Sequence, residues 1–254
     1  VSGSSFADNA ATNWGGGLVS LTVVNSAIEI NATTISQNTA QNAAGLDVTG
    51  PAELSNVTFS GNSASGDAGG LYAREGTILL SNVTVTENVA DSDANLAGNG
   101  GGVWIAGSYT VVTAMNSLIA GNLDLSPSGS FAPDCFGQLS SVGYNLVGQS
   151  AGCVLTGTMN GVITGTAPGL APLQDAGGST QVHPLLDGSP ALNAGNPATP
   201  GGIIGGACAP FDQRGVSRPQ DGRCDIGAFE GTWRPLNTIQ LSGPVVGVVG
   251  EVYT

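Results

Sequence analysis

Residues 52–62 read AELSNVTFSGN, and this stretch holds the pattern that decides the fold. Apolar and polar residues alternate from Ala52 to Phe59, which is typical of a β-strand with one buried face. The stretch ends in an apolar-x-x-Asn tetrapeptide, FSGN. The same form recurs as FADN, ISQN, VTEN and IAGN, so that five asparagines share one motif: Asn9, Asn38, Asn62, Asn88 and Asn122. The strand is therefore one unit of an internal repeat.

A glycine-rich motif recurs between these asparagines. It reads GGGL, AAGL, AGGL and GGGV and ends at Leu18, Leu46, Leu71 and Val103. The asparagine intervals are 29, 24, 26 and 34 residues. Short strands, Gly and Asn turns and a period near 25 residues fit a stacked repeat. The pattern predicts an all-β fold, a right-handed parallel β-helix (solenoid) with coils over residues 1–122. The four Leu and Val residues should form one inward column.

The repeated asparagines have a structural explanation. Asn tolerates left-handed backbone conformations and bonds its own backbone in turns, and stacked Asn side chains can bond one another. We therefore expect the five motif asparagines to form a ladder. A third element, NAT or NVT, begins at Asn31, Asn56 and Asn82. These tripeptides match N-glycosylation acceptors. A second structural Asn position in one shared register is the favoured interpretation, because it explains all three with one cause.

The composition excludes several partners. The 254 residues carry a net charge of -13, with 9% charged residues and no lysine. No basic patch can neutralise phosphates, so we expect no nucleic-acid binding. No stretch reaches the roughly 18 apolar residues of a membrane span, so we expect none.

The four cysteines fall into two local pairs, Cys135 with Cys153 and Cys208 with Cys224. They lack the spacing of metal ligands, which favours disulfides and an oxidising compartment. Four cysteines allow three pairings. We expect the local one, because each pair sits within its own loop-rich segment.

Two resemblances extend these expectations. The GG(A/L/V) and FxxN repeats of residues 1–122 resemble those of polymorphic outer-membrane proteins and related bacterial β-helix adhesins. The blocks LAPLQDAGGSTQVHPLLDGSPALNAG (170–195) and DQRGVSRPQDGRCDIGAFE (212–230) resemble the C-terminal signature of bacterial secreted choice-of-anchor Q domain proteins. In such sequences the signature closes the solenoid. The resemblance thus implies that residues 123–235 form further coils and a disulfide-braced cap in the same domain, with export and surface attachment.

Residues 236–254 change character. The text of 237–254 resembles the opening strands of bacterial immunoglobulin-like repeats. We expect a linker or first strand of a following module, or a β-strand exchanged with a neighbouring copy. The second case would make 237–254 a site of self-association.

Catalytic chemistry finds little support in the sequence. Polysaccharide lyases and hydrolases need clustered carboxylates or a positioned base. The coil carboxylates do not recur in one register: Asp47, Glu53, Asp67, Glu75 and Glu87. Arg74 is the only basic coil residue, and the lone histidine, His183, has no visible nucleophile partner. Arg214, Arg218 and Arg223 lie among acidic residues, and we expect internal ion pairs rather than an anionic-sugar site. We predict no catalytic residues and no enzyme.

Asp91, Asp93 and Asn95 hold the first three oxygen positions of a calcium loop. The following Gly and the closing Glu are missing, so calcium is the only cofactor to consider and a polar loop tip is favoured. That loop is also a reasonable binding-site candidate.

Three function classes remain. The favoured one is a non-catalytic extracellular module of the bacterial cell surface, structural or adhesive, with a protein or polysaccharide partner. A subunit of a self-assembling extracellular filament or sheath is the first alternative. A carbohydrate-binding or polysaccharide-degrading enzyme is the second.

Overall fold

The computed structural model describes residues 1–21, 27–95, 98–126, 131–201 and 206–231. The expected terminal strand over 237–254, and the boundary at 236, lie outside these residues. Within them the protein is all-β, with parallel sheets and two disulfides.

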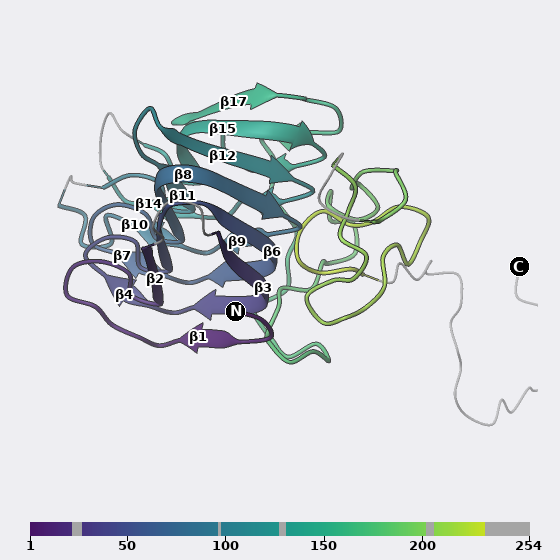
Figure 1. Ribbon diagram of the computed structural model, residues 1–254, viewed down its shortest axis with the longest axis horizontal. Helices are drawn as coiled ribbons and strands as arrows, with labels where there is room; N and C mark the ends of the chain where they lie inside the picture. Colours follow the sequence, from purple (N-terminus) through teal and green to yellow (C-terminus); the bar gives the residue numbers. More distant parts are fainter. Residues whose placement is uncertain (22–26, 96–97, 127–130, 202–205, 232–254) are drawn as a thin grey trace, which may run out of the picture.

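One sheet contains the long strands of the repeats (Figure 1). Its members are β1 (Ser5–Ala7), β3 (Ile28–Ser36), β6 (Ala52–Ser60), β8 (Leu71–Ser81), β9 (Thr84–Thr86), β12 (Thr110–Met115), β13 (Leu118–Ile119), β15 (Cys135–Gly143), β16 (Leu146–Val147), β17 (Cys153–Gly157) and β18 (Ile163–Thr164). The pairings among these strands are parallel, and each joins a strand to its equivalent one repeat away. Ile28 lies opposite Ala52, Ala52 opposite Ile78, and Ile78 opposite Val112.

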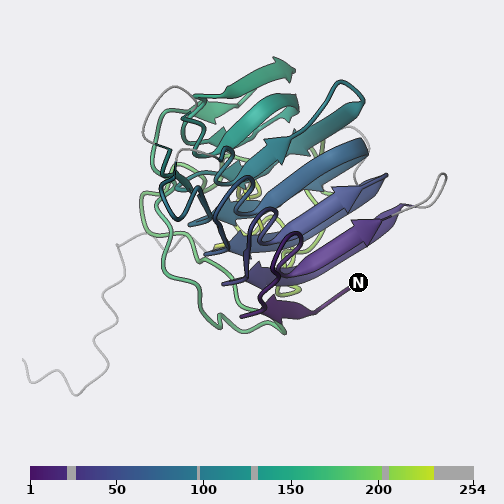
Figure 2. The same ribbon diagram turned by 90° about the vertical axis from the view of Figure 1, so that its left-hand side faces the viewer.

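Shorter strands complete each repeat. The strands β2 (Leu18–Leu21), β5 (Leu46–Thr49) and β11 (Val103–Ile105) complete the 14-stranded sheet that the described residues form. In parallel register, β2 pairs with β5, β5 with the start of β8, and β11 with the starts of β8 and β15. A separate four-stranded sheet holds β4 (Thr39–Ala40), β7 (Ser63–Ala64), β10 (Val89–Ala90) and β14 (Leu123–Asp124). Figure 2 shows the strands of successive repeats stacked along the molecule, from the purple N-terminal strands to the teal ones.

The glycine-rich motifs align as expected. Leu18, Leu46, Leu71 and Val103 are successive register partners, and Cys135 continues the column beyond Val103. Leu46, Leu71 and Val103 are fully buried in the main core, and Leu18 packs against it. The glycines before them have no room for a side chain: a Cβ on Gly70 would lie 2.4 Å from the carbonyl oxygen of Gly102. Close stacking of these corners therefore requires glycine.

The five motif asparagines form one continuous hydrogen-bonded ladder. The Nδ2 of each donates to the Oδ1 of the next, at 2.9 Å from Asn9 to Asn38, 2.9 Å from Asn38 to Asn62, 2.8 Å from Asn62 to Asn88 and 2.9 Å from Asn88 to Asn122. The backbone N–H of each donor residue reaches the same oxygen.

Asp134 ends this ladder, although no repeat motif pointed to it. Its Oδ1 accepts the N–H and Nδ2–H of Asn122 at 3.0 and 2.9 Å, and its Oδ2 accepts from the backbone of Gln149. Every amide in the ladder points its N–H toward this carboxylate. The aligned donors favour its charge, whereas burial raises its pKa above the ordinary value.

The two NVT tripeptides share a register, because Asn56 and Asn82 occupy equivalent positions, but the NAT tripeptide does not, which corrects the sequence interpretation for Asn31. Asn31 lies opposite Ser55 and is exposed, so the equivalent of Asn56 is Ala32. Ala32, Asn56 and Asn82 have φ of 48°, 52° and 51°, as does Asn116 at 48° in the next repeat. The shared feature is thus a left-handed corner, at which Asn is favoured and Ala is tolerated.

The C-terminal part corrects a second expectation. Residues 166–201 and 206–231, here called the lateral segment, do not cap the end of the stack. They run along its side, beside several successive repeats (Figure 1). In Figure 2, which faces the opposite side, the strands stand in front of this segment.

An outward column of the long strands explains this position. After Ser5 come three threonines: Thr34, Thr58 and Thr84 are register partners, and all three are buried beneath the lateral segment. Gln213 joins two of them, because its Nε2 donates to the Thr34 hydroxyl at 2.8 Å and its Oε1 accepts from Thr58 at 2.7 Å. The Ala228 N–H donates to Thr84 at 2.9 Å.

The same column becomes apolar farther along the stack. Leu118 lies opposite Thr84, and Leu146 lies opposite Leu118. Both leucines are buried in a second core cluster with Ala191 and Ile226 of the lateral segment. The segment is thus held by hydrogen bonds at one end and by apolar burial at the other.

The disulfides join the expected partners, Cys135 with Cys153 and Cys208 with Cys224. Their locations differ, because the first joins the neighbouring strands β15 and β17 and only the second lies in the lateral segment. Two disulfides indicate an oxidising environment. Across the described ranges, no helix has the length and apolarity needed to cross a membrane.

Candidate functional site: a polar groove beside an aromatic row

A second polar column runs beside the glycine-rich corners. Its members stand four residues before the buried column, at Trp14, Asn42, Asp67 and Asn99. The backbone N–H of Asp67 donates to Asn42 Oδ1 at 2.9 Å, and the N–H of Asn99 donates to Asp67 Oδ1 at 2.9 Å. Trp14 forms a parallel bridge with Asn42. The sequence analysis missed this column, although its spacing is as regular as that of the asparagine motif.

Three members of this column, Asn42, Asp67 and Asn99, line a groove of about 450 Å³. Its lining residues follow β4, β7 and β10 in the chain. These strands lie on the side of the stack away from the lateral segment (Figure 1). Nearly all of its lining residues carry amides, hydroxyls or carboxylates: Gln41, Asn42, Ser65, Gly66, Asp67, Asp93, Asn95, Gly98 and Asn99. Such a lining offers both donors and acceptors to a polar ligand.

Asp67 is the carboxylate at the centre of the groove column. Its partial burial raises its pKa from 3.8 to about 6, against the lowering effect of hydrogen bonds from Asn99, while the charge of Asp124 adds to the rise. At neutral pH the side chain is therefore mainly ionised, and it accepts hydrogen bonds.

An aromatic row lies next to the groove. Tyr72, Trp104 and Phe136 follow the buried column by one residue and are register partners. Their ring centroids are 4.5 Å apart for Tyr72 and Trp104 and 6.0 Å for Trp104 and Phe136, with edge-to-face geometry. Trp14 meets Tyr72 at 5.4 Å. Burial raises the pKa of Tyr72, and the charge of Arg74 opposes that rise. Tyr72 packs with Ala43 and Ala68, which directly follow the groove residues Asn42 and Asp67, so the row and the groove adjoin.

Arg74 belongs to this row and is not a free base. Its guanidinium binds both carboxylate oxygens of Asp47, at 2.6 and 3.0 Å. It also lies 3.6 Å from the ring centroid of Trp14 and 4.5 Å from that of Tyr72. The ion pair neutralises Arg74, and its guanidinium lies over one face of the Trp14 ring. Trp14 as a whole residue is 39% exposed.

The calcium candidates form a turn. Asp91 is buried, has φ 50° and accepts the N–H of Asn95 at 3.0 Å. The Nδ2 of Asn95 donates to Asp93 Oδ2 at 2.8 Å. Asp93 and Asn95 line the groove. Among the residues that the structure places, no group of three or more His, Cys, Asp or Glu side chains could hold a metal ion.

His183 joins the lateral segment to the repeats. One ring nitrogen lies 2.8 Å from the Ala171 carbonyl oxygen, and the other 2.8 Å from the Ser60 hydroxyl. Burial lowers its pKa, and Glu87 Oε2, 4.0 Å away, opposes that shift. The ring is therefore neutral at pH 7, and both its nitrogens are occupied by structural bonds.

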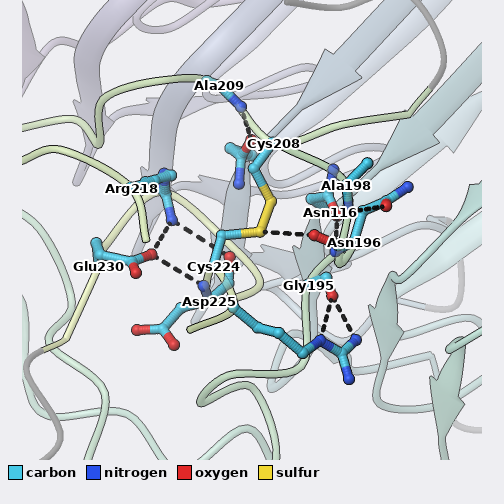
Figure 3. Close-up of a disulfide and its surroundings, with 12 residues drawn as sticks. Asn116, Gly195, Asn196, Ala198, Cys208, Ala209, Arg218, Cys224, Asp225 and Glu230 are labelled. Atoms are coloured by element: carbon cyan, nitrogen blue, oxygen red, sulfur yellow. Dashed lines mark hydrogen bonds and ion pairs between the residues drawn. A yellow bond between two sulfur atoms is a disulfide. The ribbon is translucent and has the colours of Figure 1, made fainter. Parts of the chain in front are cut away.

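The arginine cluster is internal, as the sequence analysis expected (Figure 3). Arg218 is fully buried and pairs with Glu230 at 2.7 Å, and Arg214 pairs with Asp212 at 2.7 Å. Arg223 instead bonds the Gly195 carbonyl oxygen. Burial raises the pKa of Asp225 to about 7, with the charge of Glu230 adding to the rise.

The five coil carboxylates have different surroundings in the structure. Of the five, Asp67 lines the groove, together with Asp93 from the loop over residues 91–95. Asp47 is paired with Arg74, and Glu87 lies near His183. Glu53 on β6 and Glu75 on β8 are exposed.

The chain matches no protein-family model, no curated protein and no solved structure at a significant level. The function is therefore inferred from the arrangement of the residues described above.

Proposed function

We propose that this chain is a non-catalytic adhesive module of the bacterial cell surface, built as a right-handed parallel β-helix. Parallel pairing at intervals of one repeat supports the stacked-coil architecture. The two disulfides support an extracellular location, and the signature resemblance of residues 170–195 and 212–230 supports surface attachment.

One observation carries the proposal. In the described residues, the groups best suited to catalysis are engaged in structural contacts. Arg74 is neutralised by Asp47, His183 is bonded on both ring nitrogens, and Arg218 is buried against Glu230. What the stack presents outward is a polar groove beside aromatic rings, which suits recognition more than turnover.

The test is adhesion of the labelled protein to intact bacterial and host cells. We expect saturable binding that persists after the cells are washed at high salt, because a highly acidic protein cannot bind cell surfaces by charge alone. Uniform absence of binding would contradict the proposal.

Two other functions give different outcomes. A filament subunit would assemble into fibres visible by electron microscopy, and deletion of 237–254 would abolish them. An enzyme using the groove carboxylates would release soluble sugar, and Asp67→Asn or Asp93→Asn would stop the release.

A further inference from the structure

We infer that the groove and the exposed ring of Trp14 together bind a neutral oligosaccharide. This inference rests on the adhesive function and names the class of ligand for it. The groove volume, about 450 Å³, lies within the range of about 300–1,000 Å³ found for ligand sites.

The lining matches the hydrogen-bonding needs of sugar hydroxyls. Each hydroxyl both donates and accepts, so a sugar site needs both kinds of partner. Gln41 and Asn95 are exposed residues of the groove, and Asn95 Nδ2 already donates to Asp93 within the loop. The Gln41 amide carries both a donor and an acceptor. The carboxylates of Asp67 and Asp93 accept, and bonds to charged acceptors are the stronger ones.

Trp14 supplies the apolar part of the site. Its backbone forms a parallel bridge with Asn42, which lines the groove, and the residue remains 39% exposed. Edge contact with Tyr72 and the guanidinium of Arg74 fix the orientation of the ring. A rigid aromatic surface beside polar groups suits the apolar C–H face of a pyranose ring.

The charges select against acidic sugars. Two carboxylates line the groove, and the nearest cation, Arg74, is bonded to Asp47. The net charge of -13 repels anionic polymers at longer range. A uronic-acid or sulfated chain would meet uncompensated like charge, whereas a neutral chain would not.

The test is calorimetric titration of the full chain with neutral oligosaccharides, namely cello-, manno- and galacto-oligosaccharides, and with oligogalacturonate as the acidic counterpart. We expect saturable binding of at least one neutral series and binding about tenfold weaker or more for oligogalacturonate. Asp93→Asn and Trp14→Ala should each weaken neutral binding about tenfold or more, the effect of losing one hydrogen bond to a charged group or one stacked ring.

Matched controls use residues outside the groove. Glu53→Gln changes an exposed carboxylate on β6, and Tyr109→Ala removes an aromatic ring that is 84% exposed. Both should leave affinity unchanged. Asp93 is exposed, so its variant tests the groove even if Trp14→Ala unfolds. Absence of neutral-sugar binding, a preference for oligogalacturonate, or equal affinity of Asp93→Asn and Glu53→Gln would overturn the inference.

The outcomes separate the inference from the proposed function. Cell adhesion that persists in Asp93→Asn, without sugar binding by the native protein, would refute the saccharide site and leave the adhesive function standing. Release of reducing sugar from a bound oligosaccharide would refute the non-catalytic function and leave the saccharide site standing.

Discussion

Replacing Asn88 with Ala should break the asparagine ladder at its centre. Asn88 is fully buried, and its Oδ1 accepts both the N–H and the Nδ2–H of Asn62 at 3.1 and 2.8 Å. Its Nδ2 donates to Asn122, Phe59 and Thr86. The Ala variant leaves two donors of Asn62 without this acceptor, each at a cost of about 1–3 kcal/mol, so we expect a loss of about 4 kcal/mol in the free energy of unfolding.

Asn9→Ala is the matched control. Asn9 stands at the exposed end of the same ladder, and its backbone N–H to Asn38 survives the substitution. We expect a loss of about 1 kcal/mol or less. Urea unfolding followed by circular dichroism measures both variants against the native protein, with equal m-values required for comparison. Losses that agree within about 1 kcal/mol would refute the claim that the ladder is a cooperative buried network.

Three further predictions concern charge and cross-links. Asp67→Asn should leave stability unchanged near pH 4 and raise it by about 1 kcal/mol above pH 6, as thermal melts at several pH values will measure. The reason is that the raised pKa of native Asp67 makes the native protein lose stability as pH rises from 3.8 to about 6. Solvent screening of this half-buried group reduces the effect below that of the full pKa shift. The native protein should lose stability as pH falls below 6.5, since the pKa of His183 is lowered and the unfolded chain binds the proton more readily; His183→Gln should weaken this acid loss, and an unchanged acid limb would contradict the assignment. Joint replacement of Cys208 and Cys224 by Ser opens a loop with a sequence separation of 16 and should lower the free energy of unfolding by about 3 kcal/mol. Thermal melts in the absence of reductant measure this loss. A fully stable variant would show that the lateral segment does not depend on its cross-link.

The sequence predicted those parts of the repeat that face inward. Asn62 and Leu71 occupy positions where burial and close stacking restrict the residue type, so their spacing is visible in the chain. The same holds for the cysteine pairs, since each lies within one local segment. The register of Asn31 could not be predicted correctly, because the left-handed corner holds Ala32 in this repeat and Asn in the following ones.

The outward faces could not be predicted in the same way. Thr34 and Thr58 look like solvent-facing threonines in the sequence, and only the three-dimensional structure shows Gln213 bonded to both. The resemblance of the C-terminal blocks implied an end cap, whereas Gln213, Ala228 and His183 of this segment bond the sides of three successive repeats. The polar column of the groove could have been predicted from the sequence, because Asp67 and Asn99 each stand four residues before a member of the buried column.

The most direct measurement of the central claim combines adhesion and turnover in one sample. The labelled protein is incubated with insoluble neutral polysaccharides, and the bound protein and the released soluble sugar are both quantified. A non-catalytic adhesin predicts saturable binding that Asp93→Asn weakens, with no sugar release above that of a heat-denatured control. Sugar release that Asp67→Asn or Asp93→Asn abolishes would contradict the account.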